Sequence, residues 1–134
     1  MTQQVKGEFE VAHSAQPGCD MGDGSEARHS RFDKRFHGDL EATSVVHMLA
    51  IGTDVPGSAA YVALERLSAT LLGRTGTFFL QHRGTMTRGS PSLSLTVVPD
   101  SATGELTGLS GSMAIDIADG KHFYTFDYTL DEPE

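Results

Sequence analysis

The sequence has little of several residue types, and each shortage excludes a class of protein. A single cysteine, Cys19, leaves no partner for a disulfide within the chain. Tryptophan is absent, which removes the usual aromatic platform for stacking sugars. No apolar run approaches the ~20 residues that a helix needs to cross a membrane, and polar residues rather than a signal-type apolar stretch follow Met1. We therefore expect a cytoplasmic protein with no membrane partner.

Positive charge is also scarce. Lysine and arginine together number 10 against 18 aspartates and glutamates, for a net charge of -8. Surfaces that bind nucleic acids carry clustered lysine and arginine, so we expect no nucleic-acid partner. The densest basic stretch, from Arg28 to Arg35, also contains Asp33 and is interpreted as the solvent-exposed face of a strand.

Alternating apolar and polar residues dominate the rest of the chain. Two-residue turns at Gly73-Arg74, Arg88-Gly89 and Asp119-Gly120 separate runs rich in β-branched and aromatic residues, a pattern typical of an antiparallel β-meander. No segment has the 3.6-residue period of a helix. The sequence therefore predicts an all-β fold, an antiparallel β-barrel of about eight strands, as one domain over residues 1–134, because closure removes the exposed sheet edges.

Two segments interrupt this regularity. Residues 14 to 26 mix glycines, a proline and acidic residues, which predicts a mobile loop. At Gly38 the sequence allows either a hairpin turn or a bend within one continuous strand. A two-residue turn at Gly38-Asp39 would pair Phe36 with Glu41, an apolar with a charged side chain, so we favour the bend.

Glu65 and His82 are the candidate catalytic residues. A turn at Gly73-Arg74 sets Glu65 directly opposite His82 on the apolar face of the predicted sheet. A carboxylate beside an imidazole in an apolar chamber holds one tautomer and suits general acid–base chemistry on a small substrate. The alternative is a purely structural pair, because buried charges are normally found paired whether or not they catalyse.

Four further side chains on the same face are candidate ligand-binding residues: Tyr61, Met86, Tyr124 and Tyr128. The tyrosine hydroxyls would orient a ligand carbonyl, or would serve core and rim packing alone. None of the six histidines has the short spacing common in metal sites, so we expect no metal and no cofactor.

Five segments of the chain carry a family resemblance. Residues 32–44, 61–66, 79–82, 103–111 and 119–128, taken in order, resemble a bacterial family of uncharacterised proteins known as domain of unknown function 3224. This resemblance implies a barrel similar to allene oxide cyclase. The Thr103–Gly111 segment is similar to the glycine-rich turn of that cyclase and of dirigent proteins. Related barrels include cyclases that hold a flexible apolar substrate in a productive shape, although the family itself has no agreed reaction.

Two functions remain open from the sequence. The first is a barrel that binds a small apolar molecule, with isomerisation or cyclisation as a compatible activity; whether the protein is an enzyme is left open. The second is a fully packed, non-catalytic barrel that acts by self-association as a homo-oligomer or by binding a partner. The interior volume beside Glu65 and His82 distinguishes them, since a packed barrel has no room for a ligand.

Overall fold

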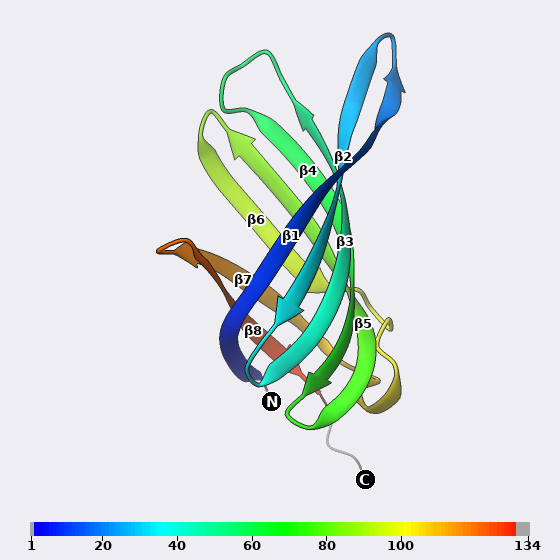
Figure 1. Ribbon diagram of the computed structural model, residues 1–134, viewed down its shortest axis with the longest axis vertical. Helices are drawn as coiled ribbons and strands as arrows, with labels where there is room; N and C mark the ends of the chain where they lie inside the picture. The colour runs from blue at the N-terminus through cyan, green and yellow to red at the C-terminus, as the bar shows by residue number, and fades with distance from the viewer. Residues whose placement is uncertain (1, 131–134) are drawn as a thin grey trace.

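Eight antiparallel strands follow one another around a closed barrel in the computed structural model, which describes residues 2–130 (Figure 1). Each strand pairs with its neighbours in the sequence, and β1 pairs with β8 to close the barrel. A single turn of 3-10 helix, η1, lies between β6 and β7. The strands are β1 (Gln3–Gly22), β2 (Ser25–Phe36), β3 (Leu40–Gly52), β4 (Ala59–Leu71), β5 (Arg74–Thr87), β6 (Ser90–Val97), β7 (Ser110–Ala118) and β8 (Lys121–Thr129), with η1 at Gly104–Leu106. The predicted all-β barrel is confirmed.

Glycine is the second residue of the two-residue turns at residues 72–73, 88–89 and 119–120, and this preference corrects one predicted register. Arg88-Gly89 and Asp119-Gly120 form two-residue turns as predicted, and both residues of each have positive φ. At the β4–β5 connection, however, the turn residues are Leu72-Gly73, because a type I′ turn favours glycine at its second position. Glu65 therefore pairs with Leu80 rather than with His82. The shift is of two residues, so each side chain keeps its predicted face.

The predicted loop at residues 14–26 is instead a β-hairpin. β1 continues to Gly22 and β2 begins at Ser25, with Asp23 and Gly24 in the turn at positive φ. The composition misled the prediction because Pro17 falls at a shift in register between Gln16 and Cys19, and a bulge of this kind tolerates a residue that lacks an N–H group.

Gly38 lies in a hairpin connection and not in the bend that we favoured. Residues 37–39 connect the two strands, and Phe36 pairs with Ala42, so apolar side chains face one another. Gly38 has a φ of 107°, and a Cβ there would approach Lys6 O and Tyr124 Oη to 3.2 Å. The longer connection removes the mismatch with Glu41 that counted against a turn.

The two ends of the barrel differ. At the end that holds the β2–β3 and β4–β5 hairpins, large side chains fill the interior, and Phe126 stacks between Phe78 and Tyr128 at centroid distances of 5.9 and 5.3 Å. Leu106 of η1 and the nearby Leu109 are buried against this core. We call this end the closed half.

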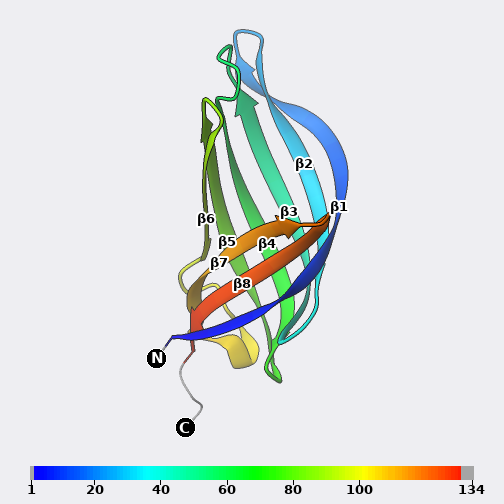
Figure 2. The ribbon, with the colours of Figure 1, turned by 90° about the vertical axis from the view of Figure 1, so that its left-hand side faces the viewer.

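The other end, the open half, has a shorter wall. β6 and β7 share only the pairs Leu95–Met113 and Thr96–Ser112, and the β1–β8 ladder stops at Phe9–His122. The β7–β8 hairpin consequently crosses at mid-height, while β1–β6 extend beyond it (Figure 2). The inner face of β1–β6 is thus accessible in this half. Within residues 2–130, no helix is long and apolar enough to cross a membrane.

Candidate functional site

A cluster of polar side chains lies inside the barrel where the closed half meets the open half. It consists of Lys34 on β2, Ser44 on β3, Glu65 on β4 and His82 on β5, four successive strands of the wall. Each occupies an inward position in its strand, and Lys34 pairs directly with Ser44. Glu65 is 0% exposed and His82 5%, and the Lys34 side chain is 8% exposed. The predicted inward orientation of Glu65 and His82 is confirmed.

Glu65 is the centre of this cluster. His82 Nε2 lies 2.7 Å and Lys34 Nζ 3.4 Å from its Oε1, and Ser44 Oγ donates to its Oε2 at 2.6 Å. Glu65 and His82 therefore make the predicted contact although they are not directly opposite in the ladder. They sit diagonally across β4 and β5, a separation that long side chains bridge.

Burial raises the pKa of the Glu65 carboxyl, but its neighbours more than reverse this effect. The hydrogen bond from His82, the positive charge of Lys34 and the Ser44 hydroxyl together hold the pKa below its usual range. Glu65 is accordingly ionised at neutral pH and acts as an acceptor. His82 must then carry a proton on Nε2, and in the neutral ring Nδ1 is left with a lone pair.

The second ring nitrogen of His82 reaches accessible space. Nδ1 has no hydrogen-bond partner within residues 2–130, and no fully buried side-chain nitrogen or oxygen of these residues lacks a partner. Nδ1 is therefore not sealed in the protein. The His82 side chain lines a cavity of about 200 Å³ on the open side of the cluster.

Lys34 was missed by the sequence analysis, which placed it on an exposed basic strand face. Its Nζ lies inside the barrel, 5.0 Å from the ring centroid of Phe9 and 5.9 Å from that of Phe36. The signal was present in the alternation, because Phe32 and Phe36 flank Lys34 at a spacing of two residues and so share its face. Arg31, in contrast, points outward and pairs with Asp33 at 3.0 Å.

The cavity beside His82 has mainly apolar walls and opens towards the mouth of the barrel. A second cavity of about 340 Å³ lies beyond it and shares Met48 and Tyr61 with it. The lining residues of the inner cavity are Phe9, Val11, Phe32, Lys34, Val46, Met48, Tyr61, Ala63, His82, Ile115 and His122.

Two of the predicted ligand-binding residues lie in the open half. Tyr61 contributes to both cavities, and its ring lies over Gly84 on the neighbouring strand, where any Cβ would collide with it. Burial raises the pKa of the Tyr61 hydroxyl. Met86 lines the outer cavity and is 44% exposed. These two residues are thus positioned to contact a molecule in the open half.

The other two predicted residues lie in the closed half, and neither lines the cavities just described. Tyr124 Oη donates to the carbonyl of His37 at 2.9 Å and accepts from the Leu40 N–H at 3.2 Å, so it fastens the β2–β3 connection. Tyr128 Oη donates to Gln3 Oε1 at 2.9 Å. Both rings belong to the hydrophobic core.

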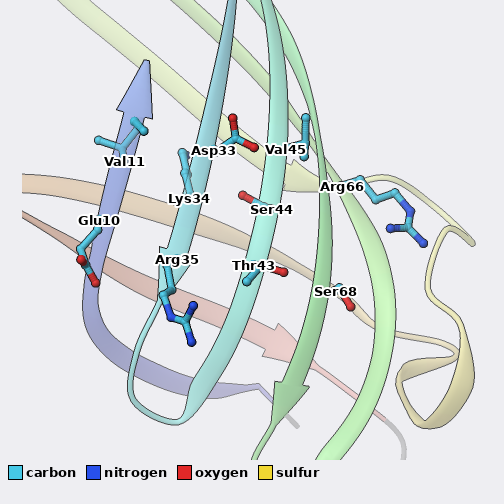
Figure 3. Close-up of a pocket in the computed structure, with 11 residues that line it drawn as sticks. Glu10, Val11, Asp33, Lys34, Arg35, Thr43, Ser44, Val45, Arg66 and Ser68 are labelled. Atoms are coloured by element: carbon cyan, nitrogen blue, oxygen red, sulfur yellow. The ribbon is translucent and has the colours of Figure 1, made fainter. Parts of the chain in front are cut away.

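A hollow on the outer surface of β1–β4 has a different character (Figure 3). Its volume is about 620 Å³, and exposed residues of both charges border it, including Glu10, Asp33, Arg35 and Arg66. Lys34 and Ser44 also border it, but their polar atoms bond to Glu65 inside the barrel. The charged atoms that the outer hollow presents are therefore those of exposed side chains, because the polar atoms of Lys34 and Ser44 are already paired.

Within the described part of the chain, no three histidine, cysteine, aspartate or glutamate side chains lie close enough together to hold a metal ion. His29 and His47 form an exposed pair, with 2.8 Å between Nε2 and Nδ1.

Comparison with known proteins places this barrel in a family. A family model described as "Protein of unknown function (DUF3224)" matches residues 5–128. A crystal structure of a DUF3224 protein of unknown function from Shewanella oneidensis MR-1 is 44% identical in sequence, with a TM-score of 0.90 over 98% of this chain and 100% of that one. No curated protein matches. The chain belongs to the DUF3224 family.

Proposed function

We propose that this DUF3224 protein binds a small, mostly apolar molecule in the open half of its barrel, with Lys34, Glu65 and His82 at the floor of the site. The observation that carries the proposal is the cavity of about 200 Å³ directly beside this buried, charged cluster. A few polar groups converging on an apolar pocket are the usual composition of a ligand site.

The size of the cavity supports a small ligand. An engineered apolar cavity of about 150 Å³ holds benzene in another protein. The inner cavity is larger, and the outer cavity of about 340 Å³ shares two of its walls. A molecule of roughly a dozen non-hydrogen atoms would fill the inner cavity and extend past Tyr61.

Chemical activity is compatible with this site. His82 is oriented by Glu65 as a general base is oriented in many enzymes, and Lys34 supplies a fixed positive charge. The glycine-rich segment at residues 103–111, which resembles that of allene oxide cyclase, supports isomerisation or cyclisation as the reaction by analogy of fold.

A matched pair of substitutions tests binding. Ala63 lines the cavity and Val62 lies next to it on the outer face, 56% exposed. Ala63→Leu should fill the cavity and abolish the binding of hits from a fragment screen read by ligand-observed NMR, whereas Val62→Leu should leave them bound. A screen without hits, or hits that bind Ala63→Leu equally well, would reject the proposal.

Self-association is the second candidate, and one observation favours it. Leu49, Val62 and Leu64 are exposed by 38%, 56% and 58% and form a strip across the outer face of β3 and β4. Exposed apolar surface of this kind is typical of protein–protein interfaces. If the strip is an interface, Val62→Lys should convert an oligomer to a monomer in light scattering, and a monomeric wild-type protein would exclude this function.

A further inference from the structure

The ionisable groups at the cavity decide what kind of molecule it can bind. Three basic or cationic side chains, Lys34, His82 and His122, line the cavity, and among the described lining residues none is a carboxylate. Glu65 stands behind His82 and Lys34, with both of its oxygens already accepting hydrogen bonds. Lys34 and Glu65 form a pair of opposite charges, with 3.4 Å between Nζ and Oε1.

This arrangement favours a neutral ligand that develops charge during a reaction. A permanent cation would meet the Lys34 ammonium without a free carboxylate to pair with. A carboxylate would be attracted to the Lys34 ammonium, but it would compete with Glu65 for that charge and would face the lone pair of His82 Nδ1. A neutral carbonyl compound meets neither penalty, because its oxygen accepts from Lys34 and its adjacent C–H bonds face Nδ1.

The Lys34 ammonium has capacity for such an oxygen. It carries three N–H donors, while its one hydrogen-bond partner within residues 2–130 is Glu65 Oε1 at 3.4 Å. Charge-assisted N–H···O bonds are normally about 2.7–2.9 Å long, so this contact leaves the ammonium weakly satisfied. Lys34 Nζ and His82 Nε2 approach the same carboxylate oxygen, and both residues line the inner cavity.

We propose that the molecule bound here is a small apolar ketone with an acidic α-hydrogen, and that the protein catalyses its enolisation and the shift of a neighbouring double bond. This inference rests on the proposed binding function. His82 Nδ1 removes a proton from the α-carbon, and the C–H electron pair forms a C=C bond as the carbonyl electrons move to oxygen. His82 then returns the proton, to the same carbon or to the γ-carbon of a β,γ-unsaturated ketone.

Each charge that develops in this reaction faces an opposite charge already in place. The enolate oxygen forms beside the Lys34 ammonium, and the imidazolium forms against the Glu65 carboxylate. Preorganised charges of this kind are a large source of rate enhancement. His82 and Lys34 are thus the catalytic residues, and Glu65 is a positioning residue that fixes the His82 tautomer.

The test is hydrogen–deuterium exchange at the α-carbon of cyclohexanone and of 3-cyclohexen-1-one, followed by proton NMR in deuterated buffer. The wild-type protein should accelerate exchange above the buffer rate and convert the second ketone to its conjugated isomer. His82→Asn should reduce the enzymatic rate by about 10²–10⁴-fold, and Lys34→Met by about 10²-fold or more. His47→Asn, on the outer surface, should leave it unchanged.

The positioning role of Glu65 is tested separately, by the tautomer of His82 in the Glu65→Gln variant. Nitrogen-15 NMR of the wild-type protein should show His82 protonated on Nε2, and Glu65→Gln should shift the ring towards protonation on Nδ1 together with a loss of exchange activity. A purely structural role for Glu65 would leave the tautomer unchanged.

Two outcomes would overturn the inference. One is exchange at the buffer rate with every ketone, and the other is acceleration that persists in His82→Asn. Fragment hits that Ala63→Leu abolishes would in either case keep the binding function, so failure of this inference and failure of the proposed function are distinguishable.

Discussion

The closed and open halves of the barrel are built from the same strands but use their inner faces differently. In the closed half, phenylalanine and leucine meet at the axis, and Phe126 stacks between two other rings. In the open half, the inner positions include Ala63, Gly84 and a pair of opposite charges. Large side chains thus give the barrel its stability at one end, and small ones leave room at the other. The interior thus has one region that stabilises the barrel and a separate region in which we propose that a ligand binds.

The largest effect on stability is expected in the closed half. Phe126→Ala removes a side chain with no exposed surface, and a change of this kind costs about 3–5 kcal/mol in the free energy of unfolding. Urea unfolding followed by circular dichroism would measure it. Val62→Ala on the outer face is the control and should cost far less. Equal losses from the two changes would contradict the division of the interior.

The next largest loss of stability is expected when one partner of the charged cluster is removed. Glu65→Leu leaves the Lys34 ammonium buried without its carboxylate, which costs about 3 kcal/mol. The double variant Lys34→Met/Glu65→Leu should recover the part of that loss that comes from the unpaired ammonium, whereas His82 and Ser44 still lack their acceptor. Additive losses in this double-mutant cycle, measured by denaturant unfolding, would show that the two side chains do not interact.

The same cluster predicts a smaller dependence of stability on pH. The folded-state pKa of Glu65 lies below its usual value, so its ionised form stabilises the fold above the unfolded pKa of about 4.3. That contribution is lost as the pH falls from there through the folded-state pKa. Unfolding free energies between neutral pH and acid should therefore fall more steeply for the wild type than for Lys34→Met/Glu65→Leu. If the unfolding free energies of the two proteins fell in parallel with pH, Glu65 would not be the source of this pH dependence.

The smallest loss of stability is expected for a substitution in the wall of the open half. Gly84→Ala places a methyl group against the ring of Tyr61, which must swing aside, at a cost of about 1 kcal/mol. Gly52→Ala is the matched control, because a Cβ there meets nothing within 4 Å. If Tyr61 separates the two cavities, Gly84→Ala should also change the affinity of ligands that extend past it. The melting temperature and a ligand titration would report the two effects separately.

The sequence predicts the fold well because the side-chain alternation of strands survives errors in register. The turn at residues 72–73 was placed one residue too late, yet the resulting shift of two left Glu65 and His82 on the inner face and in contact. At Asp119-Gly120 the turn chemistry is unambiguous, and every predicted pair of the β7–β8 ladder is observed.

What the sequence could not supply depends on neighbours in space. Residues 14–26 have the composition of a loop, but two segments that pair with each other form a hairpin there. Lys34 lies in a basic stretch, and although the alternation with Phe32 and Phe36 indicates its face, the partners that make its burial favourable, Phe9 and Glu65, come from other strands. Tyr124 and Tyr128 share the inner face with Tyr61, but they lie in the core of the closed half and Tyr61 lies at the cavities of the open half. The alternation of side chains shows which face a residue occupies, but not how far along the barrel axis it lies.

The ladder between β1 and β8 has a consequence for the order of folding. It joins residues 3–9 to residues 122–128, so the last ladder of the barrel pairs segments from near the two ends of the chain. Contacts of such long sequence separation form slowly, because the entropy of the intervening chain must be given up first. On the ribosome, β1 is made first and has no β8 to pair with until almost the whole domain has been synthesised. One edge of β1 therefore pairs with β2 while its other edge stays unpaired through most of the synthesis of the domain, and it is in this interval that aggregation competes with folding.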